Sequence, residues 1–233
     1  MADEFLLDGL DPFELQEREA DRVFAHFSSS PGWARPSRCE GWSTRDMLGH
    51  LTGLEDYVRA GLDDAVKELI RDGSFSDDAG VAEFNDWQIG MYADLPEAEL
   101  VERWRAANLA NRAELRARGR DGTVDTSIGA YSSWLQSFHY AVEYATHGDD
   151  VYVDVPDDER AERTAWRVSV GRFVLSELEK PVEVEVTSVG VRVTGAPGRV
   201  ELSTEDFVDA TQGRLPSDHP LDAAFRQLLN TVP

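Results

Sequence analysis

The chain has 233 residues, of which 41% are hydrophobic, and it carries a formal net charge of −22 at pH 7. This length and apolar content are enough for one large domain or two small ones with a real core, and they exclude global disorder. The strong negative charge disfavours nucleic acid and anionic membrane surfaces as partners, because binding to either needs a basic stripe of side chains.

Apolar residues recur at helical spacing through the first part of the chain. We predict helices over residues 10–28, from Ser43 onward, over residues 81–93, after Pro96, and from about Tyr131 to His147. Ser43 with Asp46 three positions later indicates a capped helix start. Residues 118–130 are predicted to be a loop. Long amphipathic helices joined by loops are typical of a helix bundle.

The pattern changes after Asp157. One more helix is expected over residues 158–179, and three short segments then alternate apolar and polar residues with the period of a strand, VEVEVTS, VRVTGA and RVELST. Two helical segments follow, within residues 204–214 and 220–232. We therefore predict an α+β fold with two domains, a helix bundle over residues 1–155 and a small α+β domain over residues 156–233.

Three ionisable side chains form a column on the last predicted helix of the bundle. His139, Glu143 and His147 are four residues apart, a spacing that stacks side chains on one helix face. His50 falls among the apolar positions of the second helix, so it also points toward the buried side. Two imidazoles and one carboxylate, from His50, His147 and Glu143, suit zinc and also non-haem iron, nickel or manganese.

The spacing of Glu143 and His147 by itself leaves two interpretations open. The pair either forms part of a metal site, completed by His50 from a facing helix, or is a solvated pair in which the helix dipole favours His147 in the last turn. The single cysteine, Cys39, has no base nearby in the sequence and is expected to be a small, buried apolar residue.

The sequence also indicates a compartment. A lone cysteine cannot form an internal disulfide, which fits a reducing cytoplasm. The first residues are acidic, unlike a signal peptide, and no apolar run approaches the roughly 18 residues of a membrane span. We expect a cytoplasmic protein that does not associate with membranes.

Two separated motifs resemble those of a known family. Residues 36–51 resemble the pattern Pro-Ser-x-Cys-x-Gly-Trp-(Ser/Thr)-x-x-Asp-x-x-x-His-Leu, and Glu143, His147 and Asp150 resemble the pattern Glu-x-x-x-His-x-x-Asp. Both patterns are those of the mycothiol-dependent maleylpyruvate isomerase family, within the DinB-like metal-binding superfamily. The resemblance covers roughly residues 10–155 and extends more loosely into the remaining tail.

The resemblance implies a DinB-like four-helix bundle in which His50, Glu143 and His147 bind a divalent metal, usually zinc. The open metal position would accept a low-molecular-weight thiol, mycothiol, whose sulfur becomes a nucleophile there. The implied activity is cis–trans isomerisation of a maleylpyruvate-like acid or transfer of the thiol to an electrophile. Two other interpretations remain, a non-catalytic metal- or ligand-binding module of this fold and a metal-free bundle that binds another protein.

Four further residues are candidates for supporting roles. Asp150 either orients the ring of His147 or is solvated at the helix end. His139 is expected to be a neighbour of the metal rather than a ligand. Arg45 and Arg214 are candidates for holding a substrate or thiol carboxylate by a bidentate fork. The expected partners are a small thiol and a small unsaturated or electrophilic acid, with the protein a monomer or a homodimer.

Overall fold

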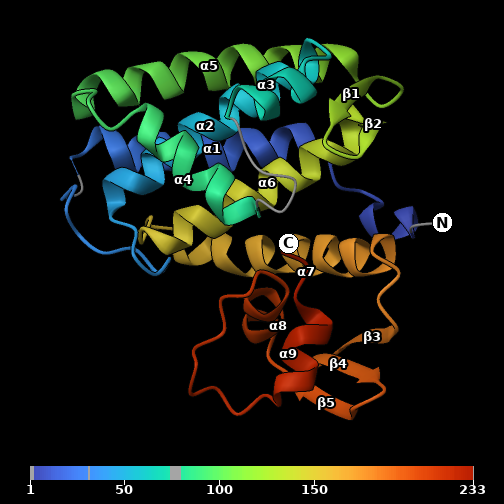
Figure 1. Ribbon diagram of the computed structural model, residues 1–233. Helices are drawn as coiled ribbons and strands as arrows, with labels where there is room; N and C mark the ends of the chain where they lie inside the picture. The colour runs from blue at the N-terminus through green and yellow to red at the C-terminus, as the bar shows by residue number, and fades with distance from the viewer. Residues whose placement is uncertain (1–2, 31, 74–79, 233) are drawn as a thin grey trace. The chain divides into compact units, whose positions relative to one another are not determined.

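The computed structural model describes residues 3–30, 32–73 and 80–232, and the chain forms two compact units (Figure 1). One unit runs from Asp11 to Asp154. The other combines the residues up to Leu10 with those from Val155 onward. The N-terminal segment, with a short 3-10 helix at Glu4–Leu7, thus groups with the C-terminal part of the chain rather than with the helices that follow it.

The first unit is built from helices. They are α1 (Pro12–Ser28), α2 (Thr44–Leu62), α3 (Val66–Asp72), α4 (Val81–Met91), α5 (Glu97–Arg118) and α6 (Ser133–Asp150). Helix α1 packs along α6 and against α5, α2 packs along α5, and α4 lies on α2. The four long helices α1, α2, α5 and α6 therefore make up the predicted bundle.

The helices begin where side chains satisfy the first backbone amides. At α2, Ser43 accepts from the Asp46 amide and the Asp46 side chain accepts from the Ser43 amide, so the predicted capping box is confirmed. Asp11 caps α1 and Ser132 caps α6 in the same way through side-chain oxygens.

Two elements of this unit differ from the prediction. Residues 118–130 are not all loop, because β1 (Thr123–Thr126) and β2 (Gly129–Ser132) pair as an antiparallel hairpin. Gly129 has φ of +110°, which a side chain rarely allows, and the Ile128 amide donates to Thr126 Oγ1 at 3.3 Å inside the turn. Helix α3 was not predicted, since its seven residues are too few to show a helical period.

One hydrophobic core joins the bundle helices. Its largest side chains that are almost fully buried come from all four long helices, and they are Phe27, Met47, Leu48, Leu51, Leu100, Trp104, Leu115 and Tyr144. Burying each aliphatic or aromatic side chain of this kind contributes about 1.5–3 kcal/mol before entropy is counted. The core thus holds α2 and α6, which carry the predicted metal ligands, in one packed unit.

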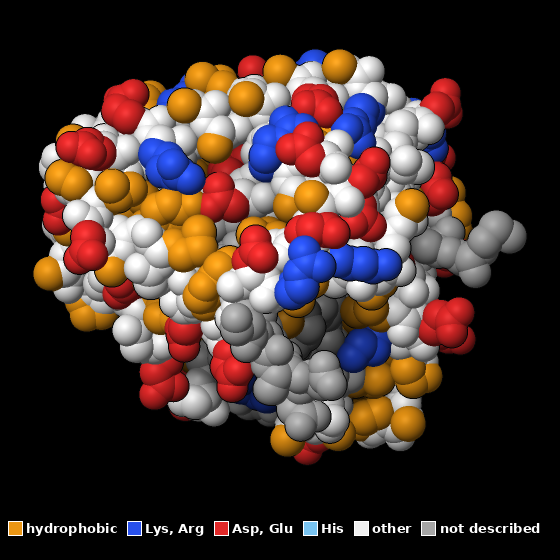
Figure 2. All heavy atoms as spheres, turned by 45° about the horizontal axis from the view of Figure 1, so that its top comes forward, with side chains coloured by type: hydrophobic (Ala, Val, Ile, Leu, Met, Phe, Trp, Pro, Cys, Tyr) orange, Lys and Arg blue, Asp and Glu red, His pale blue; other side chains and the backbone are white. Residues whose placement is uncertain are grey.

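Ion pairs join neighbouring helices at the surface of this unit. Arg59 of α2 pairs with Glu114 of α5 at 2.9 Å, and Arg105 of α5 pairs with Asp21 of α1 at 2.7 Å. Figure 2 shows basic side chains lying beside acidic ones on the viewed face. Each exposed pair contributes at most about 1 kcal/mol, so these contacts add little to the stability that the core provides.

The second unit confirms the predicted α+β class. Its elements are α7 (Asp157–Glu177), β3 (Val182–Thr187), β4 (Gly190–Gly195), β5 (Gly198–Leu202), α8 (Thr204–Thr211) and α9 (Ala223–Leu229). The strands form one antiparallel sheet in the order β3-β4-β5, with Val193 of β4 opposite Val184 and Val200. Helix α8 packs against α7 and the sheet. Within the described residues, every helix is too short or too polar to cross a bilayer.

Candidate metal centre

Three side chains from two helices converge inside the bundle unit. His50 of α2 and His147 of α6 face each other with their Nε2 atoms 3.2 Å apart, and Glu143 Oε2 lies 3.1 Å from His147 Nε2. One ligand atom from each of the three residues lies within 4.8 Å of the other two. The structure therefore brings together the three residues that the sequence predicts as metal ligands.

The site is buried on the imidazole side and open on the carboxylate side. His50 and His147 are 7% and 6% exposed, whereas the side chain of Glu143 is 46% exposed. The Trp42 ring covers His50 at a centroid distance of 5.0 Å. The site therefore meets solvent at Glu143, while both imidazoles are buried.

Two of the three distances between ligand atoms fit a small divalent cation, and the third is within 4.8 Å. Tetrahedral zinc with ligand distances of about 2.0–2.1 Å places neighbouring ligand atoms about 3.3 Å apart. The Nε2–Nε2 distance of 3.2 Å and the Nε2–Oε2 distance of 3.1 Å are close to that value. The donor set of two imidazole nitrogens and one carboxylate oxygen is one that zinc and other first-row metals accept.

The hydrogen bond at Nδ1 of His147 determines which ring nitrogen can bind a metal. His147 Nδ1 lies 3.0 Å from Oδ2 of Asp150, which is completely buried. An ionised carboxylate only accepts hydrogen bonds, so Nδ1 carries the hydrogen and donates it. In neutral His147 the lone pair then resides on Nε2, the atom that faces His50 and Glu143. This carboxylate–imidazole pair is the arrangement that orients metal-binding histidines.

The electrostatics of His147 also favour a cation at this place. Burial alone lowers the pKa of the imidazole, but hydrogen bonds with Asp150, Cys39 and Glu143 outweigh burial and raise the pKa of His147 well above its usual value of 6.5. Positive charge on this ring is thus stabilised by the groups around it. A divalent cation at Nε2 would take the place of the proton.

The remaining predicted residues lie in different settings. His139 is half-buried, with its ring 6.0 Å from the ring of Tyr131. Among the described residues it belongs neither to the group of His50, Glu143 and His147 nor to a second group of close ligand atoms from Cys39, His147 and Asp150. Arg45 donates from Nη2 to the carbonyls of Tyr92, Ala93 and Leu95, at 2.7 to 3.0 Å. It thereby holds the connection between α4 and α5, and its role toward a substrate stays a prediction.

Arg214 belongs to the other unit. It follows α8, where its amide donates to Asp209 O at 2.7 Å and its Nη1 donates to Gln212 O at 3.2 Å. Its role in binding a carboxylate also stays a prediction.

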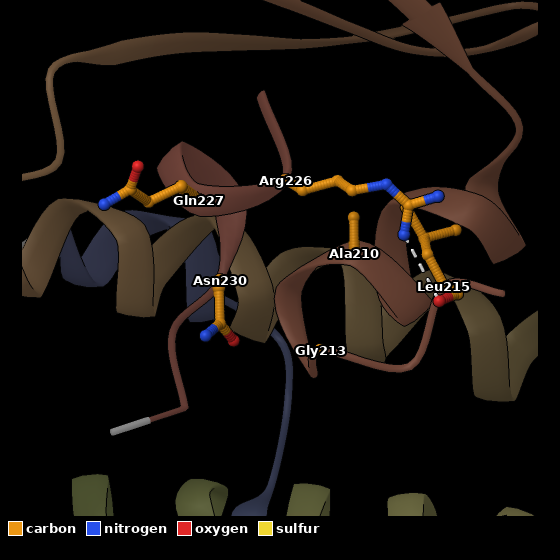
Figure 3. A pocket seen from close by; sticks show the side chains of 6 residues that line it. All are labelled: Ala210, Gly213, Leu215, Arg226, Gln227 and Asn230. Atoms are coloured by element: carbon orange, nitrogen blue, oxygen red, sulfur yellow. Dashed lines mark hydrogen bonds between the residues drawn. The ribbon is translucent and has the colours of Figure 1, made fainter. Parts of the chain in front are cut away.

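A hollow of about 260 Å³ lies in the same C-terminal unit. Figure 3 shows it between α8 and α9, with Arg226, Gln227 and Asn230 around it. The guanidinium of Arg226 donates to four loop carbonyls, those of Leu215, Pro216, His219 and Leu221. The charged group at this hollow is therefore used to hold the loop between the two helices.

The bundle also contains a buried polar cluster that was not predicted from the sequence. Glu55 of α2 is 1% exposed and accepts from Asn108 Nδ2 at 2.9 Å, from Asn111 Nδ2 at 2.8 Å and from the Tyr144 hydroxyl. Burial raises the pKa of Glu55 above its usual value, although these donors and the charge of Arg112 act against the rise. The signal in the sequence was a carboxylate four residues after the apolar Leu51 on the same helix face.

Comparison with known proteins places the chain in a family. The family model for the mycothiol maleylpyruvate isomerase N-terminal domain matches residues 13–152, a range that contains His50, Glu143, His147 and Asp150. No curated protein and no solved structure matches the chain. The match covers more than half of the sequence and confirms the resemblance seen in the two motifs. This protein therefore belongs to the mycothiol maleylpyruvate isomerase N-terminal domain family.

Proposed function

We propose that this protein is a divalent-metal-dependent enzyme that uses a small thiol as its nucleophile. The observation that carries the proposal is the position of the His147 ring. Its Nδ1 lies 3.0 Å from Oδ2 of the buried Asp150, and its Nε2 lies 3.2 Å from His50 Nε2 and 3.1 Å from Glu143 Oε2. A solvated ion pair needs neither a buried second imidazole nor a buried orienting carboxylate.

His50, Glu143 and His147 would hold the metal, and zinc is the cation that we expect. When bound, such a cation lowers the pKa of a thiol so that the thiolate exists at neutral pH. The chain's own residues have separate tasks. Asp150 keeps the His147 ring in place, Trp42 shields His50 from water, and the exposed side at Glu143 admits the thiol.

Membership of the family supports mycothiol as the thiol and a maleylpyruvate-like acid as the acceptor. In the isomerisation, the thiolate sulfur adds to the carbon–carbon double bond, and the electron pair moves to the adjacent carbonyl. The former double bond then rotates as a single bond. Expulsion of the thiolate restores the double bond in the trans form, so the thiol is not consumed. With an electrophile that carries a leaving group, the same thiolate would be transferred instead.

Metal content tests the proposal at its base. Elemental mass spectrometry on protein purified without chelators should find about one metal per chain in the wild type and much less in His50→Ala. His139→Ala is the matched control, because this imidazole lies on α6, the helix of Glu143 and His147, but outside the ligand group. A wild type that binds no metal after reconstitution would refute the enzyme and leave a metal-free interaction bundle as the better account.

A second measurement separates catalysis from simple binding. The metal-loaded protein is assayed for loss of a cis-unsaturated keto acid, with and without added mycothiol. Turnover that requires both metal and thiol supports the proposal. The alternative result is a protein that binds metal and yet turns over none of the acids and electrophiles tested in the presence of the thiol. That result would support a non-catalytic metal-binding module.

A further inference from the structure

Cys39 lies against the buried carboxylate that holds His147. Its Sγ is 3.2 Å from Asp150 Oδ2, and the same oxygen is 3.0 Å from His147 Nδ1. Ionised Asp150 can only accept, so the thiol and the imidazole N–H both donate to this oxygen. Three side chains thus form a chain of hydrogen bonds, from Cys39 through Asp150 to His147, although Cys39 and Asp150 are 111 positions apart in the sequence.

The loop that carries Cys39 is fixed at this place by its own backbone. The Cys39 amide donates to Ser37 Oγ at 3.1 Å, and the Trp42 amide donates to the Cys39 carbonyl at 3.1 Å. The amide of the neighbouring Arg38 donates to the Asp150 carbonyl at 2.9 Å. The thiol therefore meets the end of α6 because the loop is tied both to itself and to that helix.

Cys39, His147 and Asp150 also form a group whose ligand atoms lie within 4.8 Å of one another, but the thiol approaches His147 from a different side than His50 and Glu143 do. Cys39 lies on the Nδ1 side of the His147 ring, whereas His50 and Glu143 approach Nε2. One imidazole nitrogen faces the cation while the other meets the orienting group. The sulfur is thus placed to act on the carboxylate behind the histidine.

We infer that Cys39 is a positioning residue of the metal centre, which donates its thiol hydrogen to Asp150 and thereby fixes the carboxylate that orients His147. The inference rests on the proposed function, because it concerns the same metal. It replaces the expectation that Cys39 serves only as a small apolar residue. Groups outside the ligand set typically change metal affinity about 10- to 100-fold when they are lost, and we place Cys39 near the lower end because it acts through a second residue.

Two substitutions distinguish the two roles of Cys39. Cys39→Ser keeps a hydrogen-bond donor at this place, and Cys39→Ala keeps a small apolar group without the donor. If the thiol positions Asp150, the alanine variant should bind Zn²⁺ about tenfold more weakly than the wild type, and the serine variant should remain close to the wild type. If the thiol only packs, alanine should match the wild type and serine should be the weaker variant.

The measurement is Zn²⁺ affinity by competition with a chromophoric chelator, on the full chain, alongside urea denaturation of each variant. Combining Cys39→Ala with Asp150→Asn supplies a second readout, because the cysteine effect should vanish once the carboxylate is gone. In the Co²⁺-loaded protein, Cys39→Ala should shift the visible ligand-field bands, and the wild type should lack a sulfur-to-cobalt charge-transfer band.

The outcomes keep the two proposals apart. A wild type that binds no Zn²⁺ refutes the proposed function and this inference together. A wild type that binds Zn²⁺, with Cys39→Ala at the same affinity, refutes the positioning role and leaves the metal centre intact. A sulfur-to-cobalt band in the wild type would show that Cys39 is a ligand, which also overturns the inference.

Discussion

His50 Nε2 and His147 Nε2 face each other at 3.2 Å, although the two residues are 97 positions apart in the chain. Two imidazole nitrogens at this distance share either a proton or a cation. Because His147 Nδ1 is hydrogen-bonded to Asp150, an additional proton on this ring must bind at Nε2. Proton and metal therefore compete for one place.

Metal affinity should consequently depend on pH in a defined direction. The pKa of His147 is raised well above its usual value of 6.5 in the metal-free protein, so a metal must compete with a proton for this ring over a wider pH range than at an ordinary histidine. Below the raised pKa, we expect the affinity for Zn²⁺ to fall about tenfold for each unit of decreasing pH.

Chelator competition at a series of pH values checks this prediction. Calorimetry in buffers of different ionisation enthalpy should also detect the released proton. An affinity that stays constant between pH 6 and pH 8 would show that His147 carries no such proton. Without metal, the free energy of unfolding depends on pH in the opposite direction. The stabilisation by the protonated His147 ring is complete below pH 6.5 and is lost as the pH rises through the raised pKa.

Glu55→Gln should destabilise the bundle more than its small size change suggests. The two carboxylate oxygens accept from Asn108, Asn111 and Tyr144, and an amide turns one acceptor into a donor. At least one of these buried donors then faces another donor, which costs about 1–3 kcal/mol. Urea denaturation measures the loss.

The control for this substitution is Glu114→Gln. Glu114 pairs with Arg59 and Arg118 at the surface, where its side chain is 38% exposed, so its loss should cost at most about 1 kcal/mol. Equal losses for the two variants would mean that the Glu55 cluster contributes no more than an exposed ion pair.

Arg45→Ala should weaken the fold without removing the metal. Nη2 of this arginine donates to the carbonyls of Tyr92, Ala93 and Leu95, and hydrogen bonds from a charged group contribute about 1.5–3 kcal/mol. We expect a loss of that order in the free energy of unfolding, with metal content unchanged. If Arg45 also binds the acid substrate, Arg45→Lys should raise KM for the acid and leave kcat nearly constant.

Two glycines in helices should respond in opposite ways to alanine. A Cβ at Gly61 of α2 would lie 2.7 Å from the backbone oxygen of Asp125, whereas a Cβ at Gly90 of α4 meets nothing within 4 Å. Alanine favours a helix over glycine by about 1 kcal/mol. Gly90→Ala should therefore raise the melting temperature, and Gly61→Ala should lower it because the β1–β2 hairpin must move. A stabilised Gly61→Ala would show that the hairpin yields easily.

The helices that were predicted well share a local signal. Ser43 and Asp46 form the capping box at the start of α2, and Pro96 directly precedes α5. The β1–β2 hairpin was missed because its four-residue strands are too short to show an alternation. Its register depends on a turn at Gly129, which a single sequence does not separate from an ordinary loop.

In the site, too, residues related by local spacing could be predicted and long-range contacts could not. Four-residue spacing places Glu143 and His147 on one helix face, and family motifs link them to His50. No spacing rule brings Cys39 to Asp150, because that contact depends on how the loop before α2 meets the end of α6. Long-range contacts between polar side chains come from tertiary packing, and a single sequence does not record them.

The separation of the ligands along the chain has a consequence for folding. A cation between His50 and His147 would join two points 97 residues apart, and so would act on the unfolded chain as a crosslink acts. Closing a loop of that length removes much of the freedom of the unfolded state, about 4.7 kcal/mol in the chain-entropy treatment of a covalent link. Under the proposed function, the ion that binds the thiol would therefore also crosslink the chain reversibly, and loss of the metal would destabilise the bundle as well as abolish the activity.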